Sequence, residues 1–88
     1  MADRINLHIV TPDGAAREQA AQLVSVPTDF GSVGILADHA PMLCAVKKGV
    51  LRLRCESGEQ RRFLVGDGVA RVEENEVTLL VRSVEEII

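Results

Sequence analysis

Apolar and polar residues alternate along several short segments of the chain. In residues 5–9 the aliphatic side chains occupy the odd positions, and an asparagine and a histidine occupy the even ones. Residues 51–55 repeat the pattern, with Arg52 and Arg54 between the apolar positions. Because successive side chains of a strand point to opposite faces, this period of two predicts strands with one buried and one exposed face.

Residues 77–82 differ, because apolar side chains occur at both parities. A strand with two largely apolar faces is expected near the middle of a sheet. Turn signals rich in glycine, proline, aspartate and asparagine separate such segments at intervals near 8–12 residues, a spacing typical of an all-β sandwich or barrel. These signals are Pro12–Gly14, Asp29–Gly34, Lys48–Gly49, Ser57–Gly58, Gly66–Gly68 and Glu74–Asn75.

Three segments are less clear. Residues 15–22 have helical propensity, but a helix this short is marginal, and we interpret them as an edge strand or an irregular connection. The final residues 85–88 could begin a helix, and Lys47–Lys48 before Gly49 suggests a tight hairpin. No repeat or linker is visible, so the sequence predicts one domain over residues 1–88.

Composition supports this interpretation. The chain has 88 residues, of which 26 are valine, leucine or isoleucine, with valine the commonest at 12. Phe30 and Phe63 are the only aromatic residues of the Phe, Trp and Tyr type. β-Branched aliphatic side chains favour strands, so they must fill the expected core.

Charge and cysteine content exclude several classes of protein. The formal net charge is −3, which is unlike the basic field that nucleic-acid binding needs. Cys44 and Cys55 are too few for a disulfide scaffold and are expected to be buried free thiols. The chain shows neither a signal peptide nor an apolar run of about 20 residues, so any membrane association is expected through a partner.

Candidate catalytic residues do not form a recognisable set. Asp38 and His39 are adjacent, and adjacent residues of an extended segment point to opposite faces. Cys44 and Ser32 could act as nucleophiles, but neither lies in a known motif. We therefore expect no enzyme activity.

The sequence also gives no metal or cofactor signal. The histidines and cysteines lack the close spacing of zinc ligands. The glycines form neither phosphate-binding pattern, G-x-x-x-x-G-K or GxGxxG, and they are expected to serve turns. We therefore predict no metal site and no cofactor.

The segment Thr28–Pro41 is the best candidate for function, as a docking surface. It mixes polar and apolar side chains that are expected to be exposed, and prolines limit the freedom of its ends. Loops on a rigid sandwich are common sites of partner contact. From these residues alone, the sequence predicts a small β-sandwich with an interaction loop.

The stretch VPTDFGSVGILADHAPMLCAVKKGVLRLR (26–54) resembles the epsilon subunit of F-type ATP synthases, called delta in mitochondria. The opening LHIVTPDG and the segment FLVGDGVARVEENEVTLLV (63–81) also match, so the resemblance covers nearly the whole chain. The chain departs from the family pattern at Lys48, where proline is usual, at Ala37–Asp38, and at Val69, where phenylalanine is common.

The resemblance implies an all-β fold, a ten-stranded antiparallel β-sandwich. The domain would join the gamma subunit to the c-ring in the rotor of the enzyme, without chemistry or a cofactor of its own. It would lie at the cytoplasmic face of the bacterial inner membrane through that complex. The alternative is a stand-alone soluble adaptor or binding module. The partner-binding residues that the resemblance implies are Asp29, Phe30, Gly31, Ser32, Asp38, His39 and Ala40.

Two further expectations follow from the resemblance. His39 is either a loop histidine bonded to the backbone or a partner contact whose charge varies near neutral pH. The family usually continues with a C-terminal helical hairpin that can inhibit ATP hydrolysis. If residues 1–88 are the whole chain, that inhibitory arm is absent.

Overall fold

The computed structural model describes residues 4–88, which contain ten β-strands and no helix. No helix of the length and hydropathy needed to cross a bilayer therefore occurs among these residues. The strands are β1 (Ile5–Val10), β2 (Ala16–Ala21), β3 (Leu23–Thr28), β4 (Gly31–Leu36), β5 (Met42–Val46), β6 (Gly49–Arg54), β7 (Gln60–Val65), β8 (Gly68–Glu73), β9 (Glu76–Val81) and β10 (Val84–Ile87).

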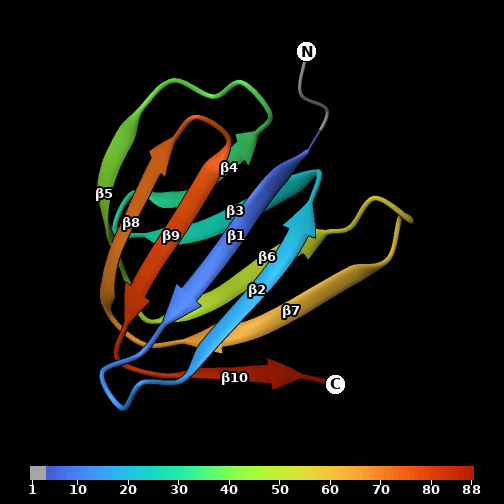
Figure 1. The fold of residues 1–88 in the computed structure, drawn as a ribbon. Coiled ribbons are helices and arrows are strands. Elements are labelled where there is room, and N and C mark those ends of the chain that lie inside the picture. Colours follow the sequence, from blue (N-terminus) through green and yellow to red (C-terminus); the bar gives the residue numbers. More distant parts are fainter. Residues whose placement is uncertain (1–3) are drawn as a thin grey trace.

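The strands form two five-stranded sheets that lie face to face (Figure 1). Sheet A has the order β2-β1-β9-β8-β5, and sheet B has the order β10-β7-β6-β3-β4. The predicted all-β sandwich is confirmed, and β9 is a central strand as its two apolar faces indicated.

One pair of strands corrects the antiparallel expectation. β1 and β9 run parallel, with Leu7 opposite Val77 and Ile9 opposite Leu79. Parallel neighbours need a long connection, and β2 to β8 supply it here. The sandwich is therefore mixed, with antiparallel order in the remaining pairs.

The core lies between the sheets and consists mainly of aliphatic side chains from alternate strand positions. Phe63 is its aromatic member and is 2% exposed. The buried cluster comprises Ile5, Leu7, Ile9, Ala21, Val24, Val26, Ile35, Val46, Leu51, Leu53, Phe63, Val65, Ala70, Val72, Val77, Leu79 and Val81.

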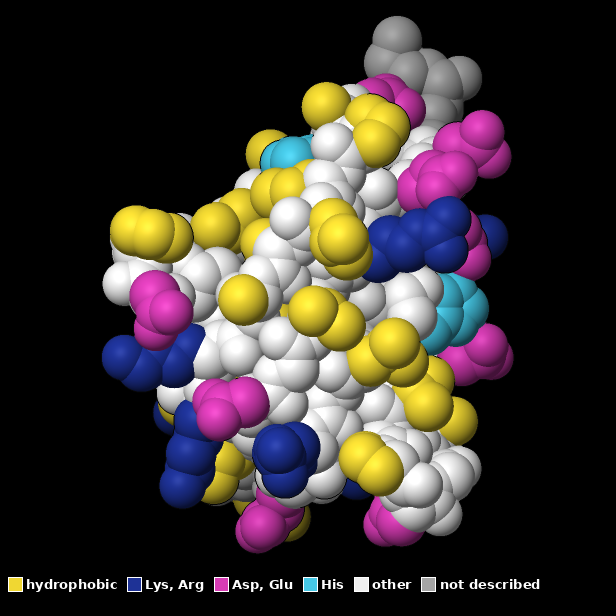
Figure 2. Space-filling model, turned by 90° about the vertical axis from the view of Figure 1, so that its left-hand side faces the viewer, with side chains coloured by type: hydrophobic (Ala, Val, Ile, Leu, Met, Phe, Trp, Pro, Cys, Tyr) yellow, Lys and Arg dark blue, Asp and Glu magenta, His cyan; other side chains and the backbone are white. Residues whose placement is uncertain are grey.

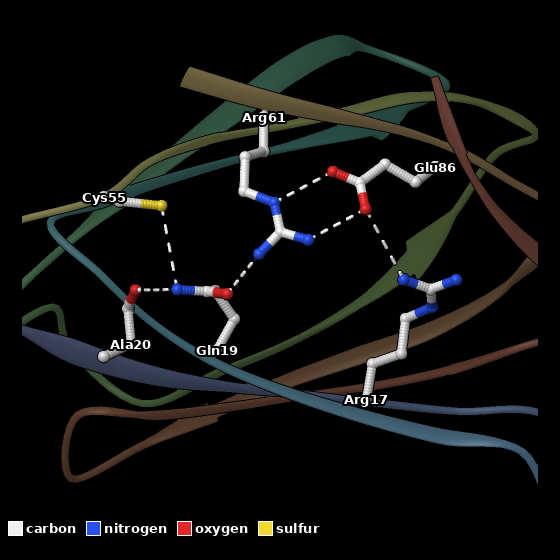
Figure 3. Close-up of polar contacts among 6 residues, drawn as sticks. All are labelled: Arg17, Gln19, Ala20, Cys55, Arg61 and Glu86. Carbon is white, nitrogen blue, oxygen red and sulfur yellow. Dashed lines mark hydrogen bonds and ion pairs between the residues drawn. The ribbon is translucent and has the colours of Figure 1, made fainter. Parts of the chain in front are cut away.

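A polar cluster closes the sandwich between β2 of sheet A and strands β7 and β10 of sheet B (Figure 3). Arg61 donates two hydrogen bonds to Glu86, at 2.9 and 2.8 Å, and a third to Gln19. Arg17 lies 3.7 Å from the same carboxylate. The guanidinium carbons of Arg17 and Arg61 lie 5.4 and 5.3 Å from the ring centre of Phe63. Charged groups thus cover the edge of the core where aliphatic packing ends.

The structure settles the three unclear segments. Residues 16–21 form the edge strand β2, in agreement with one of the two interpretations. The suggestion of a helix near the end is wrong, because Val84–Ile87 pairs with β7 as a strand. The expected hairpin at Lys47–Lys48 is also wrong, because β5 lies in sheet A and β6 in sheet B. These two lysines instead carry the chain from one sheet to the other.

Both cysteines are free thiols, as predicted. Cys55 is buried, at 7% exposure, but Cys44 is only half-buried. Cys44 faces inward on β5, and this edge strand has no further strand to cover its outer side. The expectation of full burial is therefore correct for Cys55 alone.

Candidate interaction surface

The turn between β3 and β4 presents a fully exposed phenylalanine. Thr28 Oγ1 donates a 2.6 Å hydrogen bond to the carbonyl of Gly31 and accepts one from the backbone of Phe30. Gly31 has φ of 102°, a conformation that favours glycine. The Phe30 side chain is 100% exposed, and Asp29 forms an ion pair with Lys47 at 3.6 Å. Local hydrogen bonds thus hold an apolar side chain in solvent.

The connection between β4 and β5 is held by a second set of hydrogen bonds. The His39 backbone donates to the carbonyl of Leu36 at 3.2 Å, closing a turn in which Asp38 has φ of 65°. The Asp38 backbone N–H donates to Asn75 Oδ1 at 2.6 Å. His39 Nδ1 lies 2.7 Å from the carbonyl of Ala40 and donates to it. His39 is therefore bonded to the backbone, in agreement with one of the two expectations for this residue.

The structure places the predicted binding residues in two groups at opposite ends of β4. Residues 29–32 surround its start, and residues 38–40 follow its end. Four residues of strand, 33–36, lie between the groups and span about 13 Å. All seven are exposed except His39, which is half-buried. The single interaction loop expected over Thr28–Pro41 is therefore corrected to two loops joined by β4, and their role in partner binding stays a prediction.

Both loops belong to the side of the molecule where β4 and β5 are the sheet edges. Figure 2 shows this side, with sheet A toward the right and sheet B toward the left. Hydrophobic side chains are spread over much of it, and acidic ones gather along its right border.

An apolar row also crosses the outer face of sheet A, from one edge strand to the other. Its members are neighbours in the strand register, and Val69 and Leu80 are 41% and 51% exposed. This row was not predicted from the sequence, although the two apolar faces of residues 77–82 were its signal. The apolar row consists of Ala16, Val10, Leu80, Val69 and Ala45.

Beside the apolar row, the same face of sheet A is polar. His8 lies between Glu18 and Glu76, with ring-nitrogen to carboxylate distances of 3.0 and 2.8 Å. Asn6 donates a 2.7 Å hydrogen bond to the other oxygen of Glu76. The bond to Glu76 is the main cause that raises the pKa of His8, and the bonds from Asn6 and His8 lower the pKa of Glu76. The cluster links β2, β1 and β9 across the sheet.

No arrangement in the described part of the chain suggests catalysis or metal binding. The Asp38 carboxylate is a 3.4 Å acceptor for Asn75 Nδ2, and no hydrogen bond joins it to His39. Cys44 packs against the core from β5. Among residues 4–88 no group of three or more His, Cys, Asp or Glu side chains is placed to hold a metal ion. The arrangement is suited to docking: a rigid sandwich with exposed loops and an apolar row.

These features define a class of protein, a small all-β sandwich with exposed loops and an apolar row on its surface. The family of the ATP synthase delta/epsilon chain, beta-sandwich domain, matches residues 4–87, and the chain belongs to this family. The resemblance seen in the sequence is thereby confirmed. The match covers all ten strands, and Ile88 is the one described residue outside it.

Curated relatives agree with the family. The chain is 38% identical over 82 residues to the chloroplastic ATP synthase epsilon chain of Emiliania huxleyi, covering 93% of this chain and 62% of the relative. It is 41% identical over 81 residues to the ATP synthase epsilon chain of Synechococcus elongatus, covering 92% and 58%. The chain therefore spans about three fifths of the length of these relatives.

Two solved structures share the fold. A chain in the OSCP/F1/c-ring structure of the Euglena gracilis mitochondrial ATP synthase superposes with a TM-score of 0.88 at 18% identity, covering 98% of this chain and 55% of that one. A chain in the central stalk/c-ring structure of the Tetrahymena thermophila mitochondrial ATP synthase gives 0.72 at 20% identity, covering 92% and 65%. At these identities the comparison establishes the β-sandwich fold alone.

Proposed function

We propose that the chain is a central-stalk subunit of an F-type ATP synthase that joins the gamma subunit to the c-ring and performs no chemical step itself. The observation that carries the proposal is the family match over residues 4–87. The epsilon chains of Emiliania huxleyi and Synechococcus elongatus support it through their identity to this chain. The protein would be peripheral to the membrane through the complex, at the cytoplasmic face of the inner membrane in a bacterium.

The geometry is suited to passive coupling. An aliphatic core with paired strands resists shear, so a force applied at one surface reaches the other without large deformation. The two loops at the ends of β4 and the apolar row offer separate contact areas for a shaft and a ring. Asp29 and Asp38 are exposed and would complement basic side chains on the polar loops of the ring.

Binding to purified gamma subunit and to c-ring tests the proposal. Asp38→Asn removes a charge but keeps a residue type that tolerates positive φ, and Ser32→Arg adds bulk on the exposed face of β4. Glu59→Lys, in the exposed turn between β6 and β7, is the matched control. We expect weaker binding for the first two variants and unchanged binding for the control. Equal binding by all three would remove both β4 loops from the interface.

The coupling role needs a separate measurement. In reconstituted enzyme, variants that weaken docking should lower proton pumping relative to ATP hydrolysis while the complex still assembles. Normal coupling with normal assembly would contradict the proposed role. A stand-alone binding module, the alternative function, would associate with neither the gamma subunit nor the ring, and no contact in the structure favours it.

A further inference from the structure

Three arginines gather on the outer face of sheet B. Arg52 and Arg54 on β6 and Arg62 on β7 alternate with buried residues of the same strands, so they point to solvent. Arg52 lies directly opposite Arg62 in the antiparallel register. We refer to these three residues as the arginine cluster.

The arginine cluster is not neutralised within the described chain. Among residues 4–88 the structure gives no hydrogen bond or ion pair to the side chains of the arginine cluster, whereas Arg4, Arg61 and Arg71 each pair with a glutamate. Glu85, an acidic residue on the same sheet, lies opposite Leu64 and not opposite an arginine. Positive charge is therefore concentrated on one face of a chain whose net charge is −3.

This arrangement has a cost in the free protein. Like charges directly opposite each other in neighbouring strands are destabilising. A residue choice that lowers stability at an exposed position is typical of a surface with a function. Guanidinium groups bind carboxylates through two parallel hydrogen bonds, so an acidic ligand would remove the repulsion and satisfy the free donors.

We propose that the arginine cluster docks an acidic segment of a partner polypeptide, at a surface separate from the β4 loops and the apolar row. Leu64, 41% exposed, and Val50 lie opposite each other beside the arginines, so the ligand should carry apolar side chains among its carboxylates. The two phenylalanines do not serve this face, since Phe63 points inward and Phe30 lies in the β3–β4 turn. This face therefore lacks an aromatic platform on which the bases of a single-stranded nucleic acid could stack.

The number of basic residues favours a polypeptide over a membrane as the partner. Electrostatic recognition of anionic lipid typically uses clusters of about four to eight basic residues. Three arginines on one flat sheet fall short of that number, but they match two or three carboxylates of a short segment. Phosphatidylglycerol vesicles thus provide the competing outcome in the test.

The binding test uses a labelled, acetylated ten-residue peptide of eight glutamates around two central leucines. We expect fluorescence anisotropy to show binding that weakens with salt, and backbone NMR shifts to centre on β6 and β7. Arg52→Gln combined with Arg62→Gln should weaken binding at least tenfold, while Arg71→Gln, which alters a paired arginine of sheet A, should change it less than twofold. Absent binding, shifts centred elsewhere, or equal losses in both variants would overturn the proposal. Binding to the vesicles without binding to the peptide would also overturn it.

A stability measurement tests whether the arginine cluster has only a structural role. Arg62→Glu should raise the melting temperature by a few degrees, because it replaces a repulsive cross-strand pair with an attractive one. The same variant should no longer bind the peptide. A fall in the melting temperature would show that the arginines serve the sheet and would overturn the proposal.

Discussion

Asn75 receives a 2.6 Å hydrogen bond from the backbone N–H of Asp38, which lies 37 residues away in the sequence. Both residues have positive φ, 64° at Asn75 and 65° at Asp38. The hairpin between β8 and β9 therefore fixes the position of the β4–β5 connection, which carries three of the predicted binding residues. A docking loop held by a side chain of another hairpin loses less entropy when it binds.

Asn75→Gly should release this loop without disturbing the hairpin, because glycine tolerates positive φ. We expect a loss of about 0.5–1.5 kcal/mol in the free energy of unfolding, the usual net contribution of one hydrogen bond. Asn75→Ala should lose about 1 kcal/mol more, since it adds the strain of a left-handed conformation. Hydrogen exchange checks the mechanism: the Asp38 amide should exchange faster in both variants. Unchanged exchange at Asp38 would contradict the positioning role of Asn75.

His8 should make the stability of sheet A depend on pH. Its pKa is raised from 6.5, mainly by the bond to Glu76, so its contribution is fully present below pH 6.5 and is lost as pH rises through the folded-state pKa. The pKa of Glu76 is lowered from 4.5, so its contribution is present above pH 4.5 and is lost as pH falls through its folded-state value. The contribution of His8 and Glu76 to the free energy of unfolding should therefore be largest between pH 4.5 and 6.5.

Melting temperatures of wild type and His8→Gln across pH 4–8 measure this effect. The difference between the two proteins should be largest near pH 5.5 and should shrink above pH 7. His39→Gln is the control, because the structure bonds His39 Nδ1 to the carbonyl of Ala40 and not to a carboxylate. A difference that does not vary with pH would show that the imidazole contributes only packing.

Sequence pattern predicted the strands better than it predicted their partners. Alternation identifies which side chains of β1 and β6 face the core, because that property is local to each strand. It does not identify the partner of a strand, so it missed the parallel pairing of β1 with β9 and the change of sheet at Lys47–Lys48. The two glutamates in β10 suggested a helix, and only the pairing of Val84–Ile87 with β7 makes this segment a strand.

The candidate site shows the same limit. The segment Thr28–Pro41 was recognised as suited to docking, because glycine, proline and acidic residues favour turns. Strand β4 divides this segment into two loops. The sequence of residues 31–36 alone did not identify them as one continuous strand. The apolar row requires five strands in register, and no single segment carries that information.

Glu86 should hold the last strand to the sandwich. It accepts two hydrogen bonds from Arg61 and lies close to Arg17, so one carboxylate links β10, β7 and β2 (Figure 3). Glu86→Gln should lower the melting temperature and speed hydrogen exchange in β10. Glu85→Gln on the same strand should leave that exchange unchanged, because the described structure gives its side chain no ion pair.

The pH dependence of the Glu86 variant offers a second check. Bonds from Arg61 lower the pKa of Glu86 from 4.5, so the stabilisation it provides is present above pH 4.5 and is lost as pH falls through the folded-state value. The wild type and Glu86→Gln should therefore converge in stability at low pH. A constant difference down to pH 2 would mean that the carboxylate charge is not the source of the effect.

Gly68 should be the glycine least tolerant of a side chain. A Cβ at this position would lie 1.9 Å from the carbonyl oxygen of Leu80 and 2.7 Å from Cα of Val81, both backbone atoms of the paired strand β9. Gly68→Ala must push apart the start of β8 and the end of β9, two interior strands of sheet A, at a cost of about 1–3 kcal/mol. Gly34→Ala on the edge strand β4 is the matched control, since its Cβ would make an ordinary 3.6 Å contact with the Leu23 side chain of β3. Urea unfolding should separate the two variants clearly, and equal stability would mean that β8 can shift away from β9 without loss of packing.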